Sequence, residues 1–185
     1  MTIDISWSTG LVMLIIGGAR SGKSRFALDI CSQRRNCRNR IFMATARCQD
    51  IEMEDRILRH QKERGREWTT VEEPLSVAEK IREIDRPDTI ILVDCLTLWL
   101  SNLFMEYGEN QDMIEKEITG LEKELAHVNG NVVLVTNEVG SGIVPQNSLA
   151  RRYRDISGFA NQRIAAVSNK VVQVVAGLPI LLKDE

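Results

Sequence analysis

The stretch that most restricts the fold of this chain is GGARSGKS at positions 17–24, which directly follows the apolar run LVMLII at positions 11–16. A short continuous apolar run is typical of a buried parallel strand, and residues 24–33 have the pattern of a helix. The glycines between them allow the backbone to curl so that successive N–H groups face an anion, and the helix N-terminus adds partial positive charge. The pattern predicts a phosphate-binding loop for a nucleoside triphosphate.

Three side chains have predicted roles at this loop. Lys23 is expected to reach the β- and γ-phosphates, and the Ser24 hydroxyl to bind Mg²⁺. A second metal ligand is expected from Asp94, because it ends the apolar run DTIILVD and emerges at the sheet edge where open α/β folds bind ligands. Asp94 also has the position of an N-cap for the next helix, a use that is compatible with metal binding.

Strand-like and helix-like segments alternate along the rest of the chain. Further strands are predicted at 40–45, 68–73, 88–94, 131–137, 170–177 and 179–183, and further helices at 50–64, 74–84, 96–107, 112–128 and 149–168. Such alternation favours parallel pairing with right-handed crossovers. The predicted fold is therefore α/β, a three-layer P-loop NTPase-type (RecA-like) mostly parallel sheet with helices on both faces. Residues 1–10 are expected to be an N-terminal extension and 11–185 a single domain.

Composition excludes some partners and leaves the reaction open. With 24 basic and 26 acidic residues the chain lacks the basic excess of a nucleic-acid binder. No apolar run approaches the roughly 20 residues of a membrane span, and the four cysteines have no metal-ligand spacing. We therefore expect a cytoplasmic protein without nucleic-acid partners or a membrane span. The loop itself is compatible with a phosphotransferase, a mechanical or regulatory NTPase, or a nucleotidyltransferase.

His60 is a candidate nucleophile on the charged segment DRILRHQKERGREW. At four-residue spacing Arg56, His60 and Arg64 share one face of the predicted helix. Two flanking guanidinium groups favour the neutral imidazole and suit a polyphosphate, and a neutral imidazole can attack phosphorus. The same segment also holds acid–base pairs such as Asp55 and Arg59, which are typical of a solvated surface helix. The chemistry of the residues alone leaves both interpretations open.

Several segments together resemble the bifunctional adenosylcobinamide kinase / adenosylcobinamide-phosphate guanylyltransferases of cobalamin biosynthesis. The resemblance runs from about residue 13 to residue 183. The segments that carry it are GGARSGKSRFA, ATA at 44–46, RILRHQKERGREWTTVEEP, ILVDCLTLWLSNL, VLVTNEVGSGIVP and LARRYRDISGFANQ. The histidine segment and TNEVGSGIVP in combination make the resemblance specific, whereas the phosphate loop alone would not.

The resemblance implies two reactions. In the first, the γ-phosphate of ATP or GTP passes to the aminopropanol hydroxyl of adenosylcobinamide. In the second, His60 attacks the α-phosphorus of GTP and releases pyrophosphate, and adenosylcobinamide phosphate then displaces the histidine to give adenosylcobinamide-GDP. A covalent intermediate of this kind splits a difficult displacement into two easier ones. The resemblance also implies a homotrimer, and it leaves the preferred phosphoryl donor and the corrinoid-binding residues open.

The family's nucleotide contacts match a defined set of positions in this chain. They are Gly17, Gly18, Ala19, Arg20, Ser21, Gly22, Lys23, Ser24, Ala44, Thr45, Ala46, Gln61, Lys62, Glu63, Arg64, Glu72 and Asp94. Two departures from the family pattern are Ala46, where a serine is often found, and a single histidine where some relatives carry two in tandem. The first weakens a hydroxyl contact, and the second removes ambiguity about the nucleophile. A stabilising role of Arg56 toward the phosphates is our inference from its spacing.

Two further features have alternative interpretations. Glu138 follows a buried strand and could contact the corrinoid or orient the acceptor hydroxyl, or its segment could be a structural loop. Arg151, Arg152 and Arg154 cluster on a predicted helix and could bind phosphate, although a surface or subunit-contact face is favoured. Two other functions are alternatives to the bifunctional enzyme: a P-loop small-molecule kinase without guanylyltransferase activity, and a regulatory P-loop NTPase.

Overall fold

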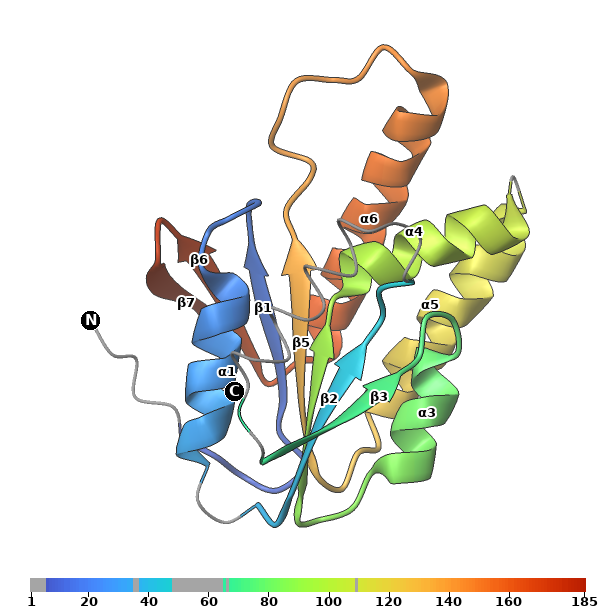
Figure 1. Cartoon of the computed structure of the whole chain (residues 1–185). Coiled ribbons are helices and arrows are strands. Elements are labelled where there is room, and N and C mark those ends of the chain that lie inside the picture. Colours follow the sequence, from blue (N-terminus) through green and yellow to red (C-terminus); the bar gives the residue numbers. More distant parts are fainter. Residues whose placement is uncertain (1–5, 35–36, 48–64, 66, 109) are drawn as a thin grey trace.

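One seven-stranded sheet organises the part of the chain that the computed structural model describes, residues 6–34, 37–47, 65, 67–108 and 110–185 (Figure 1). The strand order is β3-β2-β4-β5-β1-β6-β7, and neighbours are parallel except β6 and β7. The strands are β1 (Val12–Gly17), β2 (Asn39–Ala44), β3 (Trp68–Glu72), β4 (Thr89–Asp94), β5 (Asn131–Asn137), β6 (Lys170–Val175) and β7 (Leu178–Asp184). The glycine-rich motif therefore leaves the sheet between two neighbouring strands, β5 and β6.

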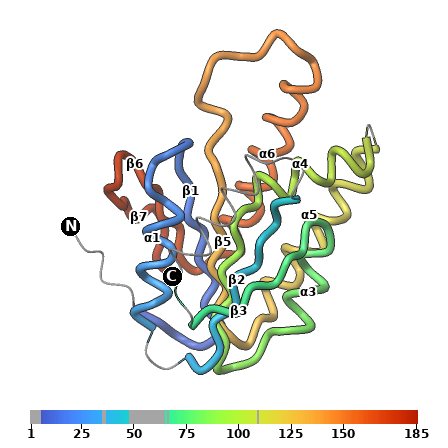
Figure 2. Tube along the Cα trace, in the orientation of Figure 1, coloured from blue at the N-terminus to red at the C-terminus, as the bar shows by residue number. Residues whose placement is uncertain are grey.

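Helices cover both faces of this sheet (Figures 1 and 2). The described helices are α1 (Lys23–Gln33), α3 (Val77–Ile84), α4 (Leu96–Tyr107), α5 (Gln111–Leu125) and α6 (Ser148–Val167). Alternate residues of β1 enter different cores: Met13 and Ile15 pack with α1, whereas Leu14 belongs to the core that contains α3, α4, α5 and α6. The predicted three-layer, mostly parallel α/β architecture is confirmed.

The helix predicted from Pro74 begins three residues later, at Val77. The carboxylate of Glu73 accepts hydrogen bonds from the backbone N–H groups of Leu75 (3.0 Å) and Ser76 (2.8 Å), and so closes a turn ahead of the helix. Side-chain bonds of this kind compete with the helical backbone pattern at an N-terminus. The predicted start was wrong because proline at a first helical position is a weak signal beside a capping acid.

The amphipathic helix predicted over 112–128 is α5, and it ends at Leu125. Beyond it, the chain is held by Asp85, which is 8% exposed and accepts from the N–H of Asn129 (2.7 Å) and of Gly130 (2.7 Å). These bonds hold the turn that leads from α5 to β5. The predicted end at Val128 was therefore three residues too late, because the chain leaves the helix before it reaches the residues that Asp85 holds.

The last predicted extended segment is β7, which turns back on β6 through Ala176 and Gly177, both with positive φ (51° and 79°). The helix predicted over 50–64 lies outside the described residues. Among the helices that are described, none has the length and apolar character required to cross a bilayer.

Candidate nucleotide-binding site

The glycine-rich motif forms a tight loop between the end of β1 and the start of α1. The N–H of Ser21 donates to the carbonyl of Gly18 (3.2 Å), and the N–H of Phe26 donates to the carbonyl of Gly22 (2.9 Å) to begin the helix. Gly22 is in the left-handed region, with φ of 92°, where glycine meets no steric penalty. The N-terminus of α1 therefore lies at the loop, which is the arrangement that binds phosphate.

Gly17 is required by close approach. A Cβ atom at this position would lie 2.5 Å from the carbonyl oxygen of Val174 and 2.6 Å from Oγ of Ser21. The N–H of Gly177, at the turn of the β6–β7 hairpin, donates to the carbonyl of Ser21 (2.8 Å). The phosphate loop and the β6–β7 turn, more than 150 residues apart in sequence, therefore lie side by side (Figure 2). The hairpin braces the loop from one side.

Lys23 is held inside the loop. The residue is 8% exposed, and its Nζ donates to the carbonyl of Gly18 at 3.0 Å. A buried ammonium at the centre of an N–H-lined turn favours an anionic ligand. Gly18, Ala19 and Arg20 form the exposed outer part of the loop, and Ser24 is half-buried in the first turn of α1.

The ends of four parallel strands bring the predicted residues to one edge of the sheet. Ala44 is in register with both Glu72 and Asp94, and Gly17 is in register with Asn137. Residues in register on parallel strands point to the same face. The residues two positions earlier on β1 and β4, Ile15 and Leu92, pack in the core that contains α1. The phosphate loop, Asp94, Ala44 and Glu72 therefore share the α1 face.

Thr45 fixes the geometry around Asp94. Its side chain is fully buried; its Oγ1 donates to the carbonyl of Cys95 (2.8 Å) and accepts from the N–H of Cys95 (2.8 Å). Its carbonyl accepts from Nδ2 of Asn102 (2.7 Å), a 5% exposed residue of α4. The hydroxyl of Thr45 is thus committed to the protein, and it ties the end of β2 to the turn after Asp94. Next to it, Ala46 is half-buried.

Burial and charge act together on the thiol that follows Asp94. Burial raises the pKa of Cys95 to about 11, and the neighbouring Asp94 carboxylate adds to the increase. The Cys95 thiol is therefore neutral at physiological pH, so that the carboxylate of Asp94 is the acidic group on this turn.

Several predicted residues lie outside the described part of the chain: Arg56, His60, Gln61, Lys62, Glu63 and Arg64. Their predicted roles remain predictions. In sequence they lie between the end of β2 at Ala44 and the start of β3 at Trp68.

Glu138 is engaged with its own loop. Its N–H donates to the carbonyl of Gly17 (3.1 Å), and its carboxylate accepts from the N–H groups of Gly140 and Ser141 (3.1 Å for the latter). These contacts favour the structural interpretation of this residue. Arg151 similarly donates to the carbonyls of Pro145 (3.0 Å) and Gln146 (2.6 Å), and so closes the loop that precedes α6.

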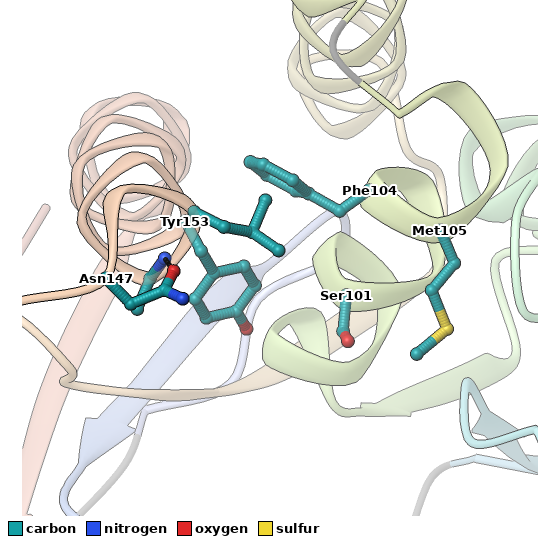
Figure 3. Close-up of a pocket in the computed structure, with 7 residues that line it drawn as sticks. Ser101, Phe104, Met105, Asn147 and Tyr153 are labelled. Carbon is teal, nitrogen blue, oxygen red and sulfur yellow. Dashed lines mark hydrogen bonds between the residues drawn. The ribbon is translucent and has the colours of Figure 1, made fainter.

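A mostly apolar cavity of about 480 Å³ lies between α4 and the start of α6 (Figure 3). Ser101, Phe104 and Met105 line it from α4, and Asn147 and Tyr153 from the other side. The rings of Phe104 and Tyr153 meet edge to face at 5.5 Å, and the Tyr153 hydroxyl donates to the carbonyl of Thr97 (2.7 Å). This cavity could not be predicted from local sequence patterns, because its lining comes from two helices that are distant in the chain.

Known proteins with similar sequences identify the family. The profile described as "Cobinamide kinase / cobinamide phosphate guanyltransferase" matches residues 13–182. The chain belongs to this cobinamide kinase / guanyltransferase family. The bifunctional adenosylcobalamin biosynthesis protein CobP of Pseudomonas aeruginosa is 41% identical over 172 residues, 93% of this chain and 97% of that protein. The proteins named CobU from Escherichia coli (strain K12) and Salmonella typhimurium are each 38% identical over 184 residues, 94% of this chain and 100% of each relative.

Solved structures support the fold of this cobinamide kinase / guanyltransferase. The flagellar accessory protein FlaH from Methanocaldococcus jannaschii matches with a TM-score of 0.50 at 12% identity, covering 96% of this chain and 80% of that one. A structure from Pyrococcus horikoshii OT3 matches with a TM-score of 0.54 at 9% identity, covering 96% and 88%. Identities this low carry the fold and no function. The predicted P-loop NTPase-type fold is confirmed, as is the predicted family of cobalamin-biosynthetic enzymes.

One residue at this edge was not predicted. Asn137 ends β5 beside Gly17, and its Oδ1 is buried without a hydrogen-bond partner in the described part of the chain. The available signal was the same one that marked Asp94: a polar residue that ends an apolar strand, here NVVLVTN.

Proposed function

We propose that this enzyme performs both transfers at one phosphate loop. The γ-phosphate of ATP or GTP passes to the hydroxyl of adenosylcobinamide, and GMP passes from GTP through His60 to adenosylcobinamide phosphate. The observation that carries the proposal is that the loop that holds the buried Lys23 and the strand that ends in Asp94 meet at one edge of the sheet. Both reactions need a triphosphate fixed at this place, and the family supplies the pair of activities.

The loop and Asp94 fit a magnesium-bound triphosphate. The Ser24 hydroxyl and the Asp94 carboxylate are hard oxygen ligands of the kind that Mg²⁺ prefers. Among the described residues, no group of three or more acidic, histidine or cysteine side chains could hold a metal ion by itself. Mg²⁺ often keeps only one or two carboxylate ligands when it binds together with a nucleotide. When bound, the ion neutralises charge on the phosphates, while Lys23 and the loop N–H groups hold them in place.

The guanylyl transfer proceeds in two successive displacements at the α-phosphorus. The neutral imidazole of His60 forms a bond to the α-phosphorus as the bond to the bridging oxygen of pyrophosphate breaks, and pyrophosphate leaves with the electron pair. A phosphate oxygen of adenosylcobinamide phosphate then attacks the same phosphorus, and the imidazole leaves. Glu72 and Asp94 complete the nucleotide contacts. The support for His60 is the segment that resembles the family.

A labelling experiment tests this assignment. The protein is incubated with GTP labelled at the α-phosphate and with Mg²⁺, denatured, and assayed for protein-bound label that is acid-labile and alkali-stable. We expect label on the wild type and none on His60→Ala. The matched control is His127→Ala, because His127 is exposed just beyond α5, where its Nδ1 contacts the carbonyl of Lys123 (2.8 Å). Equal labelling of both variants would exclude His60 as the nucleophile.

The same experiment separates the other two functions. A kinase without guanylyltransferase activity would leave the protein unlabelled while still phosphorylating cobinamide, and a regulatory NTPase would give neither product. Lys23→Ala is expected to abolish both activities, because both reactions need the triphosphate that the same phosphate loop binds. Wild-type phosphorylation by this variant would refute the shared site. Chelation of Mg²⁺, or Asp94→Asn, should lower both rates as well.

We also propose that the protein is a cytoplasmic homotrimer without nucleic-acid partners. Exposed apolar side chains support an oligomer: Leu178 (58%) and Leu182 (57%) on β7, Phe159 (65%) on α6 and Ile143 (97%) in the loop before α6. The near-zero net charge of −2 supports the absence of nucleic acid. Light scattering during gel filtration tests the trimer, and a monomer at micromolar concentration would contradict it.

A further inference from the structure

We propose that Asn137 is a further catalytic residue of the kinase reaction, whose amide contacts the γ-phosphate and orients the attacking hydroxyl. This inference rests on the proposed function of the loop. It begins from position: β5 lies between β4, which carries Asp94, and β1, which leads into the loop. Asn137 is in register with Gly17, and Asp94 is in register with Val135, two residues earlier on the same face. Asn137 therefore lies at the sheet edge between the phosphate loop, which follows β1, and the carboxylate of Asp94, which ends β4.

The backbone of Asn137 is fixed on every side. Its N–H donates to Oγ1 of Thr97 in α4 (2.8 Å), and its carbonyl accepts from Nδ2 of Asn161 in α6 (3.3 Å). Asn161 is 7% exposed and is itself oriented by the Thr136 hydroxyl, which donates to its Oδ1 (2.9 Å). The next N–H, of Glu138, donates to Gly17 (3.1 Å). Two helices and β1 thus hold this residue rigidly, and none of these bonds uses its side chain.

The side-chain oxygen is unsatisfied within the described part of the chain. Oδ1 of Asn137 is buried and has no hydrogen-bond partner in the described part of the chain. Buried polar atoms are nearly always paired, and an unpaired one destabilises the fold relative to an apolar side chain of similar shape. Oγ of Ser21, which lies against Gly17 in the loop, is buried and unpaired in the same way. Two unpaired polar atoms therefore lie on the residues beside Gly17, and a rotation of the Asn137 amide toward a bound nucleotide would give its oxygen the partner that it lacks.

The ligand group at this point follows from the neighbouring residues. Lys23 would hold the β- and γ-phosphates from the loop, and Asp94 would hold a magnesium ion that neutralises charge on them. A side chain between them faces the γ-phosphate and the hydroxyl that attacks it. A neutral amide can donate to a phosphate oxygen through its NH₂ and accept from the hydroxyl through Oδ1. A carboxylate in its place would repel the phosphate.

The step that Asn137 assists is the transfer of the γ-phosphoryl group. The acceptor hydroxyl oxygen forms a bond to the γ-phosphorus while the bond to the β–γ bridging oxygen breaks. ADP or GDP leaves with the electron pair, and the hydroxyl proton is released to solvent. The amide takes up no proton and acts by orientation. Guanylylation of His60 occurs at the α-phosphorus with an imidazole nucleophile, so it should depend little on this residue.

The test compares Asn137→Ala with wild type in three measurements. We expect ATP affinity to fall about tenfold, as for loss of a hydrogen bond to a charged group, while ADP affinity changes less than about twofold. The kcat for phosphorylation at saturating ATP should fall about 10- to 100-fold, and labelling with α-labelled GTP at saturation should stay within about threefold. Tm should be unchanged or higher, because an unpaired polar atom is removed. Asn137→Asp should be no more active than Asn137→Ala.

The control is Asn110→Ala, a remote asparagine whose Oδ1 caps α5 by accepting from the N–H of Met113 (3.4 Å). It should leave all three measurements unchanged and lower Tm slightly. Equal losses of ATP and ADP affinity in Asn137→Ala, or equal losses in both transfers, would show a structural role and overturn the proposal, as would an unchanged kcat. The ATP and ADP comparison needs no acceptor. It therefore decides the role of Asn137 even if the wild type fails to phosphorylate cobinamide, a result that would refute the proposed function instead.

Discussion

The hydroxyl of Thr45 offers a direct test of how the site is held. Thr45→Val keeps the shape of the side chain and removes its oxygen. The oxygen is the acceptor of the buried Cys95 N–H (2.8 Å), so the variant leaves that N–H unpaired. The carbonyl of Cys95 is less affected, because it also accepts from the N–H of Trp99 (3.1 Å). The perturbation is therefore one buried donor without a partner, the Cys95 N–H, one residue beyond the end of β4.

The size of the effect follows from that single donor. An unsatisfied buried N–H costs about 1–3 kcal/mol, and we take about 2 kcal/mol for Thr45→Val. For a domain of this length, about 2–4 °C of Tm corresponds to each kcal/mol, so Tm should fall by about 4–8 °C. Because the hydrogen bonds between Thr45 and Cys95 position the turn that follows Asp94, the affinity for the magnesium–nucleotide complex should fall as well.

Calorimetry of thermal unfolding and titration with Mg²⁺ and GTP measure the two effects. The matched variant is Thr45→Ser, which keeps the hydroxyl and removes only a buried methyl group, at a cost of about 0.8 kcal/mol. It should retain nucleotide affinity. If Thr45→Val unfolds within 1 °C of wild type, or if Thr45→Ser is the less stable of the two, the hydroxyl does not hold Cys95 and the reasoning fails.

Three further predictions concern the phosphate loop, the turn held by Asp85 and the thiol of Cys95. Gly17→Ala should reduce nucleotide affinity at least about tenfold, because its Cβ would lie 2.5 Å from a carbonyl oxygen of β6; Gly18→Ala, with no atom within 4 Å of its Cβ, should bind like wild type in the same titration. Asp85→Ala should lower the unfolding free energy, measured in urea, by about 2–4 kcal/mol, because the N–H groups of Asn129 and Gly130 both lose their acceptor. The folded fraction should keep the kinetic constants of the wild-type enzyme, and a loss of activity at full stability would contradict a purely structural role. The unfolded thiol of Cys95 ionises above its ordinary pKa of 9.0, whereas the folded thiol keeps its proton until about 11; the unfolding free energy should therefore fall as pH rises from 9 to 11, and Cys95→Ser should reduce that slope by up to about 1.4 kcal/mol per pH unit.

Much of the fold follows from local sequence signals. The apolar run before the glycine-rich motif, the strand that ends in Asp94 and the alternation of strands and helices were sufficient to predict a mostly parallel α/β sheet. The motif placed Lys23 and Ser24 at the start of α1. These features are local, because each depends on residues a few positions apart, and hydrophobic periodicity reports them directly.

The parts that could not be predicted depend on register between distant segments. Asn137 lies beside Gly17 only because β5 pairs with β1 across 120 residues, and no local pattern reports that pairing. Thr45 was expected to contact the nucleotide through the resemblance, yet its hydroxyl bonds to Cys95, 50 residues away. Once a register is known, strand alternation explains which of these side chains reach the α1 face.

The hydrogen bond from Gly177 to the carbonyl of Ser21 has a consequence for how the protein matures on the ribosome. A nascent chain that has emerged only as far as α1 carries the whole glycine-rich motif, but it lacks the hairpin turn that supports it. Competence to capture a nucleotide should therefore arise late in translation, after β6 and β7 have joined the sheet. Ligand capture would then report that nearly the whole polypeptide has folded.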